Sequence, residues 1–212
     1  MPSLNELAKS NPFYARPAWW LMRRLTPRRL DGVWRWVSGW TLKYLDRTII
    51  AIKPLDVLGA TIRASRAPFF TAASLPQRLQ RCAVHELTHA CTPQLFATPW
   101  LNEGIATLSV DRYAGRATVS ADSLSRLMPA KPPTAYRKLG RLTDTEIAGF
   151  YSLGYWLTRY LFETQTDMLR DWIKRPRGLE PKLARVLGTK KQDLWRAVPE
   201  LLKTYFKGVN NG

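Results

Sequence analysis

The stretch His85-Glu86-Leu87-Thr88-His89 contains both histidines of this 212-residue chain, and the rest of the sequence is interpreted outward from it. Residues four apart lie just over one turn from each other on an α-helix, so the two imidazoles project from one face. Glu86 lies on the flank of that face. This H-E-x-x-H pattern is typical of two zinc-binding histidines and a glutamate that acts as general base on the metal-bound water.

A catalytic zinc site usually takes three protein ligands and keeps one position open for water, so the pattern is one ligand short. With no further histidine in the chain, the third ligand must be a carboxylate or a thiolate. Glu103 is the carboxylate in the most telling context, because Thr98-Pro99 is a typical helix start that places Glu103 in the first turns of a second helix. Gly104 and Ala106 are small, so we expect this helix to pack closely against the histidine helix.

His85, Glu86, His89 and the segment Trp100-Leu101-Asn102-Glu103-Gly104-Ile105-Ala106 resemble the gluzincin zinc metallopeptidases. The spacing is similar to that of compact peptidase MA-like domains, which are related to the aminopeptidase N-like family. In these families the glutamate of the second motif is the third zinc ligand. The resemblance covers residues 48–206 and implies a zincin-like fold, Zn²⁺ as the cofactor, and a peptide or protein as the substrate.

A zinc peptidase also needs a hydrogen-bond donor for the oxyanion that develops on the scissile carbonyl. Since both histidines are assigned to the metal, this donor must be a tyrosine, an arginine, a lysine or a backbone N–H. The resemblance implies a tyrosine on a later helix, followed three residues on by glycine, and Tyr151-Ser152-Leu153-Gly154 is similar. Tyr151 is therefore the predicted catalytic donor, and Tyr155, one turn further along, is the alternative.

The substrate preference is inferred from a missing motif. Aminopeptidases of the related family carry glycine, methionine, glutamate and asparagine before the histidine helix, and that glutamate holds the substrate amino terminus. This chain has no acidic residue between Asp56 and Glu86, so we expect an endopeptidase. The alternative is a catalytically weak or inactive peptidase-like binding module that acts at an anionic membrane surface or on nucleic acid. The intact Glu86 weighs against this alternative.

The chain is strongly basic, with 33 Lys and Arg residues against 16 Asp and Glu residues and a formal net charge of +17. The excess lies on both sides of the predicted site, because residues 85–127 hold three basic and four acidic residues. Such a charge favours an anionic partner, either a membrane surface or nucleic acid. A solvated basic surface without a dedicated partner explains the charge equally well.

Two regions are expected along the chain. Residues 1–45 are predicted to form a basic, tryptophan-rich helical segment, and residues 46–212 the metallopeptidase domain. The five tryptophans of the first segment would lie in a membrane interface, stack on single-stranded nucleic acid, or pack against the second region. Neither a secretory signal nor an apolar run of about 20 residues is visible, so we expect a cytoplasmic protein, soluble or peripheral at a membrane.

Short β-branched and apolar runs predict a small sheet before the histidine helix. Turn residues separate these runs, which lie at residues 48–52, 57–58, 61–62 and 69–71. The resemblance implies a mostly antiparallel sheet packed on the histidine helix. It also implies that a strand ending near Thr71 is the edge that binds the extended substrate backbone.

Helices dominate the remaining sequence, so the fold class is expected to be α+β with a helical C-terminal lobe. Capping boxes that begin at Ser74 and Thr143 predict one helix over about residues 75–91 and another from residue 144 onward. Between them, residues 116–140 are rich in loops and prolines and are expected to form a flexible rim over the cleft. Further helices are expected after Thr166, near residues 181–187 and from Thr189, the last of them kinked or interrupted by Pro199.

Cys82 and Cys91 are the only cysteines, and both fall on the predicted histidine helix. Nine residues separate them by about 13 Å along the helix axis, which is too far for a disulfide, so both are expected to be free. Cys82 shares a helix face with the histidines. It is interpreted as a small buried residue, with a neighbour of the ligands or a weak competing ligand as the alternatives.

Overall fold

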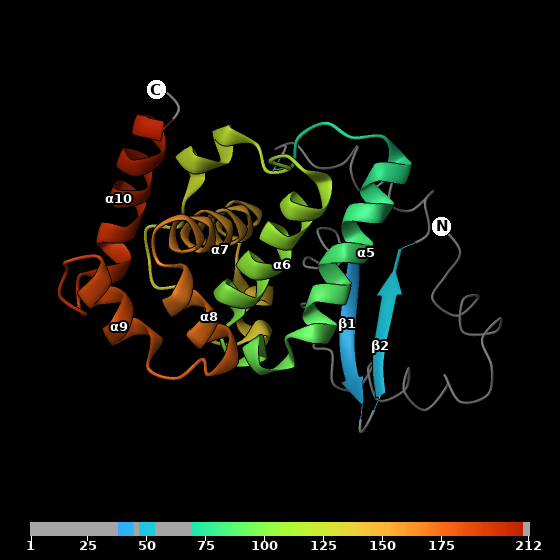
Figure 1. The fold of residues 1–212 in the computed structure, drawn as a ribbon, viewed down its shortest axis with the longest axis horizontal. Coiled ribbons are helices and arrows are strands. Elements are labelled where there is room, and N and C mark those ends of the chain that lie inside the picture. The colour runs from blue at the N-terminus through green and yellow to red at the C-terminus, as the bar shows by residue number, and fades with distance from the viewer. Residues whose placement is uncertain (1–37, 45–46, 54–68, 210–212) are drawn as a thin grey trace.

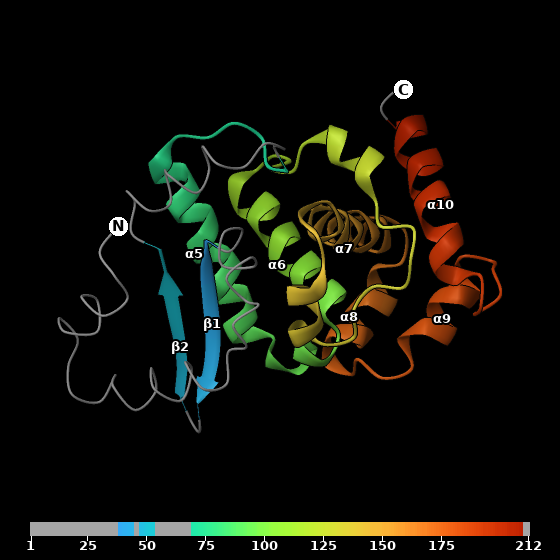
Figure 2. The same cartoon turned by 180° about the vertical axis from the view of Figure 1, so that it is seen from behind.

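The computed structural model describes residues 38–44, 47–53 and 69–209. It has an α+β architecture in which a two-stranded antiparallel sheet is followed by a helical C-terminal half. The strands are β1 (Gly39–Tyr44) and β2 (Arg47–Ile52), with Gly39 opposite Ile52 and Tyr44 opposite Arg47. In Figures 1 and 2 the sheet lies at one side of the molecule, and the helices extend from it to the opposite side.

The sheet differs in part from its prediction. β2 confirms the expected run at residues 48–52, whereas the helix expected up to residue 45 is wrong for Gly39–Tyr44, which form β1. Trp40, Thr41 and Tyr44 are aromatic or β-branched residues that suit a strand once a pairing partner is present. Residues 1–37, and the runs predicted at 57–58 and 61–62, lie outside the described residues.

The strand expected at residues 69–71 is reduced to a single antiparallel bridge between Phe70 and Val119. Thr71 N–H donates to the Thr118 carbonyl at 2.8 Å, and Ser120 N–H donates to the Phe69 carbonyl at 2.8 Å. The backbone near Thr71 is therefore hydrogen-bonded on one side to residues 118–120. Of the expected strand, the described residues show this one bridge, and any part before residue 69 lies outside the described residues.

Helix α5 (Leu75–Cys91) carries the H-E-x-x-H motif and packs on both strands. It begins with the predicted capping box, in which Ser74 and Gln77 exchange backbone and side-chain hydrogen bonds. Gly39 of β1 meets this helix without a side chain. A Cβ there would lie 2.9 Å from Cys82 Sγ and from Glu86 Cγ, so glycine allows the strand to approach the motif.

Helix α6 (Pro99–Ala114) lies between α5 and α7 (Asp144–Thr164) and is buried along most of its length. It starts at Pro99 as predicted and follows the short 3₁₀ helix η2 (Pro93–Ala97). At the crossing with α7, a Cβ on Gly104 would overlap Thr158 Oγ1 and the Gly154 carbonyl oxygen. Gly104 therefore packs against α7. The expected contact between α6 and the histidine helix is present, but Gly104 serves the crossing with α7.

The C-terminal half is helical, as expected. α7 begins with the predicted capping box at Thr143, and α8 (Thr166–Lys174) and α9 (Leu179–Val186) follow. α10 (Leu194–Val209) starts later than predicted and continues through Pro199, where one hydrogen bond is lost but the apolar face stays buried. Side chains without exposed surface in this half include Phe150, Leu153, Tyr155, Leu157, Leu161, Trp172, Leu183, Leu194 and Leu202.

The predicted rim between α6 and α7 contains two short 3₁₀ helices, η3 (Ala121–Arg126) and η4 (Tyr136–Arg141). Leu139 anchors η4 in the core, where its side chain is buried. The rim is thus tied to the body of the molecule at its end. Within the described part of the chain, no helix is both long enough and apolar enough to cross a bilayer.

Candidate metal centre

Helices α5 and α6 bring His85, His89 and Glu103 together. His85 Nε2 lies 3.1 Å from His89 Nε2 and 3.2 Å from Glu103 Oε2, and His89 Nε2 lies 3.5 Å from Glu103 Oε1. Ligand atoms arranged tetrahedrally about 2.1 Å from zinc would lie roughly 3.4 Å apart. Both the donor set and its spacing therefore fit this ion. Among the described residues, these three form the only cluster of this kind with metal-ligand spacing.

Hydrogen bonds to neighbouring groups orient two of the three candidate ligands. His89 Nδ1 lies 3.1 Å from Asn102 Oδ1, and when Nδ1 donates this bond, Nε2 is the ring nitrogen that faces the cluster and can bind a metal. Tyr136 Oη–H donates to Glu103 Oε1 at 2.8 Å. Asn102 Nδ2 in turn donates to Tyr136 Oη at 2.6 Å. A continuous chain of hydrogen bonds therefore links His89 to Glu103 through two residues that are not ligands.

The electrostatic interactions within the cluster favour the ionised form of Glu103 beside the two imidazoles. Burial alone would raise the pKa of Glu103, but the neighbouring His89 and the hydrogen bonds from both histidines hold it well below its usual range. Burial alone would lower the pKa of His89, yet the charge and hydrogen bond of Glu103 outweigh burial and raise it. Glu103 is therefore ionised near neutral pH, as a zinc ligand must be.

Glu86 lies next to the cluster and is almost fully buried. Burial raises the pKa of its carboxyl group, while the nearby His85 and the hydrogen bond from Thr41 partly offset that rise. Thr41 Oγ1 on β1 lies 2.9 Å from both Glu86 Oε2 and the Glu86 carbonyl oxygen. A carboxylate with a raised pKa and a fixed orientation suits a general base, because it takes up a proton more readily.

The two tyrosines considered as oxyanion donors have different surroundings. Tyr155 is fully buried in the core, and its hydroxyl donates a hydrogen bond to Asp111 Oδ2 at 2.6 Å. Tyr151 is partly buried, and burial together with the negative charges of Glu103 and Glu86 raises its pKa well above the usual range. The described residues give the Tyr151 hydroxyl no hydrogen bond. The Tyr155 hydroxyl is therefore engaged in the core, whereas no hydrogen bond among the described residues holds that of Tyr151.

Cys82 is a buried neighbour of Glu86, and Cys91 is exposed. Both are free, as expected from their separation on one helix. Burial and the negative charge of Glu86 raise the pKa of the Cys82 thiol to about 12, so the thiolate form that binds metal is strongly disfavoured. In the described structure Cys82 is also not part of the ligand cluster. These observations favour its interpretation as a small buried residue.

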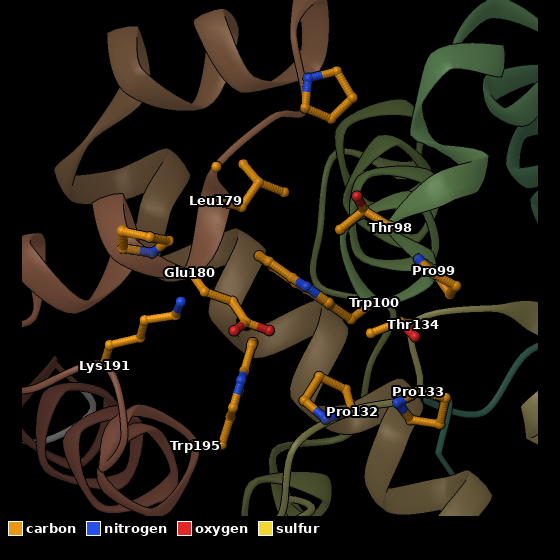
Figure 3. A pocket seen from close by; sticks show the side chains of 13 residues that line it. Thr98, Pro99, Trp100, Pro132, Pro133, Thr134, Leu179, Glu180, Lys191 and Trp195 are labelled. Atoms are coloured by element: carbon orange, nitrogen blue, oxygen red, sulfur yellow. The ribbon is translucent and has the colours of Figure 1, made fainter.

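A separate pocket of about 370 Å³ lies between the start of α6, the segment 132–134 and the α8–α9 connection, as Figure 3 shows. Trp100 and Trp195 line it together with several prolines, and the charged side chains of Glu180 and Lys191 also belong to its lining. None of its lining residues belongs to the cluster of His85, His89 and Glu103. The pocket is therefore not the candidate metal centre.

The chain was also compared with models of protein families, with curated proteins and with solved structures, and no match was found in any of the three. The functional assignment therefore depends on the residues of the candidate centre and on their geometry. The motif-based resemblance to gluzincins stays a prediction.

Sequence reasoning missed three residues of the centre. Asn102 had a signal, because it stands directly before the predicted ligand Glu103 in a motif already identified. Thr41 had none, since it falls in a segment predicted to be helical. Tyr136 had none either, because it lies 33 residues beyond Glu103 in a stretch expected to be loop. The predicted residues His85, Glu86, His89 and Glu103 do lie together.

Proposed function

We propose that this chain is a zinc-dependent peptidase of the gluzincin type with a zincin-like fold, and that it acts as an endopeptidase. The observation that carries the proposal is the convergence of two imidazoles and one carboxylate at metal-ligand spacing, with the buried Glu86 beside them. A buried polar helix face without a function would need neither three converging ligands nor an additional carboxylate at their side.

Each residue of the centre has a distinct role in this proposal. His85, His89 and Glu103 would hold the zinc ion. When bound, zinc supplies a Lewis acid that polarises the scissile carbonyl and makes water easier to deprotonate. Glu86 accepts the proton from the attacking water and passes it to the leaving amine, and Thr41 keeps the Glu86 carboxylate oriented by its hydrogen bond.

Tyr151 completes the proposed centre as a hydrogen-bond donor to the carbonyl oxygen as negative charge develops on it. Its raised pKa keeps the phenol protonated at neutral pH, which a donor requires. Gly154 lies one turn further along α7, where it packs against α6 near the ligand Glu103. This close crossing of α6 and α7 brings the tyrosine helix to the metal-binding helix.

The proposal is tested by removing and restoring the metal. The protein is stripped with a chelator, one half is reloaded with one equivalent of zinc, and both halves are incubated with a mixture of free and N-acetylated peptides. New termini are mapped by mass spectrometry. We expect internal cleavage only by the zinc-loaded half, with acetylated and free peptides cut equally well. Equal cleavage without zinc would refute a metallopeptidase, and a preference for free amino termini would refute the endopeptidase assignment.

We expect Tyr151→Phe to lower the turnover number about 10²-fold or more, because one oxyanion donor is lost while the ligand set is retained. Zinc content, measured by atomic emission after gel filtration, should remain at the wild-type level. Tyr160→Phe on the same helix is the matched control and should keep full turnover. A Tyr151→Phe variant with unchanged turnover would reject this role.

A further inference from the structure

Tyr136 connects the rim to the candidate metal centre. It is the first residue of η4, at the end of the rim stretch that separates α6 from α7. Its hydroxyl donates to Glu103 Oε1 at 2.8 Å and accepts from Asn102 Nδ2 at 2.6 Å. Both bonds use the same oxygen atom, so removing that one atom breaks both.

The two partners of Tyr136 are buried and depend on this hydroxyl. Asn102 is fully buried, with its Oδ1 next to His89 Nδ1 and its Nδ2 on Tyr136. An amide held at both ends has one fixed orientation, because exchanging its oxygen and nitrogen would place a donor against a donor. The Tyr136 hydroxyl therefore fixes Asn102, and Asn102 fixes the ring of His89.

Contacts to both oxygens of its carboxylate restrain Glu103. Oε2 lies 3.2 Å from His85 Nε2, whereas Oε1 accepts from Tyr136 and lies 3.5 Å from His89 Nε2. The shorter contact of Oε1 is thus the one to the tyrosine. Without it, Oε1 keeps only the longer contact to His89, so the carboxylate is less restrained about its Cγ–Cδ bond, and a ligand that must be reoriented binds metal more weakly.

We propose that Tyr136 is a positioning residue, which holds Glu103 directly and His89 through Asn102 in the orientation that binds metal. The inference rests on the proposed zinc site and extends it to a residue of the rim. It predicts that metal affinity depends on the Tyr136 hydroxyl even though this hydroxyl is not itself a ligand.

The test is the zinc affinity of Tyr136→Phe, measured by competition with a chromophoric chelator on the full chain. We expect the dissociation constant to rise about 10- to 100-fold, as for other groups that orient a metal ligand. The metal-free variant should stay folded, with its melting temperature lowered only by the few degrees that one unpaired buried amide costs. Tyr113→Phe is the matched control, since this side chain is 60% exposed and should leave zinc affinity unchanged.

The outcomes separate this inference from the proposed function. If the wild type binds zinc and Tyr136→Phe binds it with the same affinity, the positioning role is overturned and the zinc site stands. Unfolding of the variant, or a large fall in its metal-free melting temperature, would show that the hydroxyl serves the fold and would also overturn the inference. Absence of zinc binding in the wild type would overturn both proposals.

Discussion

Glu86→Gln is expected to reduce peptide hydrolysis by zinc-loaded protein on the order of 10²–10⁴-fold, because the amide cannot accept the proton of the attacking water. Glutamine has nearly the same shape, and its side-chain oxygen still accepts the hydrogen bond from Thr41. Glu86 is not one of the clustered ligands, so zinc content should not change. Hydrolysis is measured with a fluorogenic peptide, and bound zinc is measured on the same samples.

Two further variants define what the Glu86→Gln result means. Glu103→Gln should lose both zinc and activity, because it removes the carboxylate of the ligand cluster. Glu200→Gln, which changes an exposed side chain of α10, should lose neither. If Glu86→Gln retains more than half of the wild-type rate at equal zinc occupancy, the proton acceptor is another group and the proposed mechanism fails.

Gly104→Ala is expected to lower the free energy of unfolding by about 3 kcal/mol or more, at the upper end of the range for overpacked cores. The added methyl group would overlap Thr158 Oγ1 and the backbone of Gly154, and the backbone of α7 has no side-chain rotamer through which to move away. The melting temperature should fall by about 6–12 °C in a domain of this size. Differential scanning calorimetry of the metal-free protein measures this change.

Gly115→Ala provides the comparison at the end of the same helix. Gly115 has φ 63° and no atom that a Cβ would meet within 4 Å. Alanine there should therefore lower the free energy of unfolding only by the cost of the left-handed backbone conformation, about 1–2 kcal/mol. A Gly104→Ala variant no less stable than Gly115→Ala would mean that α6 and α7 separate easily. In that case the position of Tyr151 relative to Glu103 would not depend on the glycine crossing.

What the sequence predicted correctly is local. The spacing of His85 and His89 places them on one face once the helix is known. Each capping box, at Ser74 and at Thr143, is a pattern of only four residues that marks the start of a helix. Glu103 could be named as a candidate ligand for the same reason, because the helix start at Thr98-Pro99 and the motif around Glu103 lie within a few residues of it.

What the sequence could not predict depends on contacts between distant segments. Thr41 reaches Glu86 across 45 residues, and Tyr136 reaches Glu103 across 33. The composition around Thr41 suits a basic helix as well as a strand, and only pairing with β2 decides between them. In the same way, Gly104 indicates that another segment approaches its helix closely, but the sequence does not show which helix this is.

The placement of β1 bears on where the chain can be shortened without loss of the contacts around Glu86. A chain cut at residue 46, where composition suggests a boundary, would lose the hydroxyl that holds Glu86 and the glycine that lets the sheet reach α5. It would also leave β2 without its partner strand. A shortened chain that keeps these contacts therefore has to include Gly39, because the sheet takes one strand from each of the two regions expected from composition.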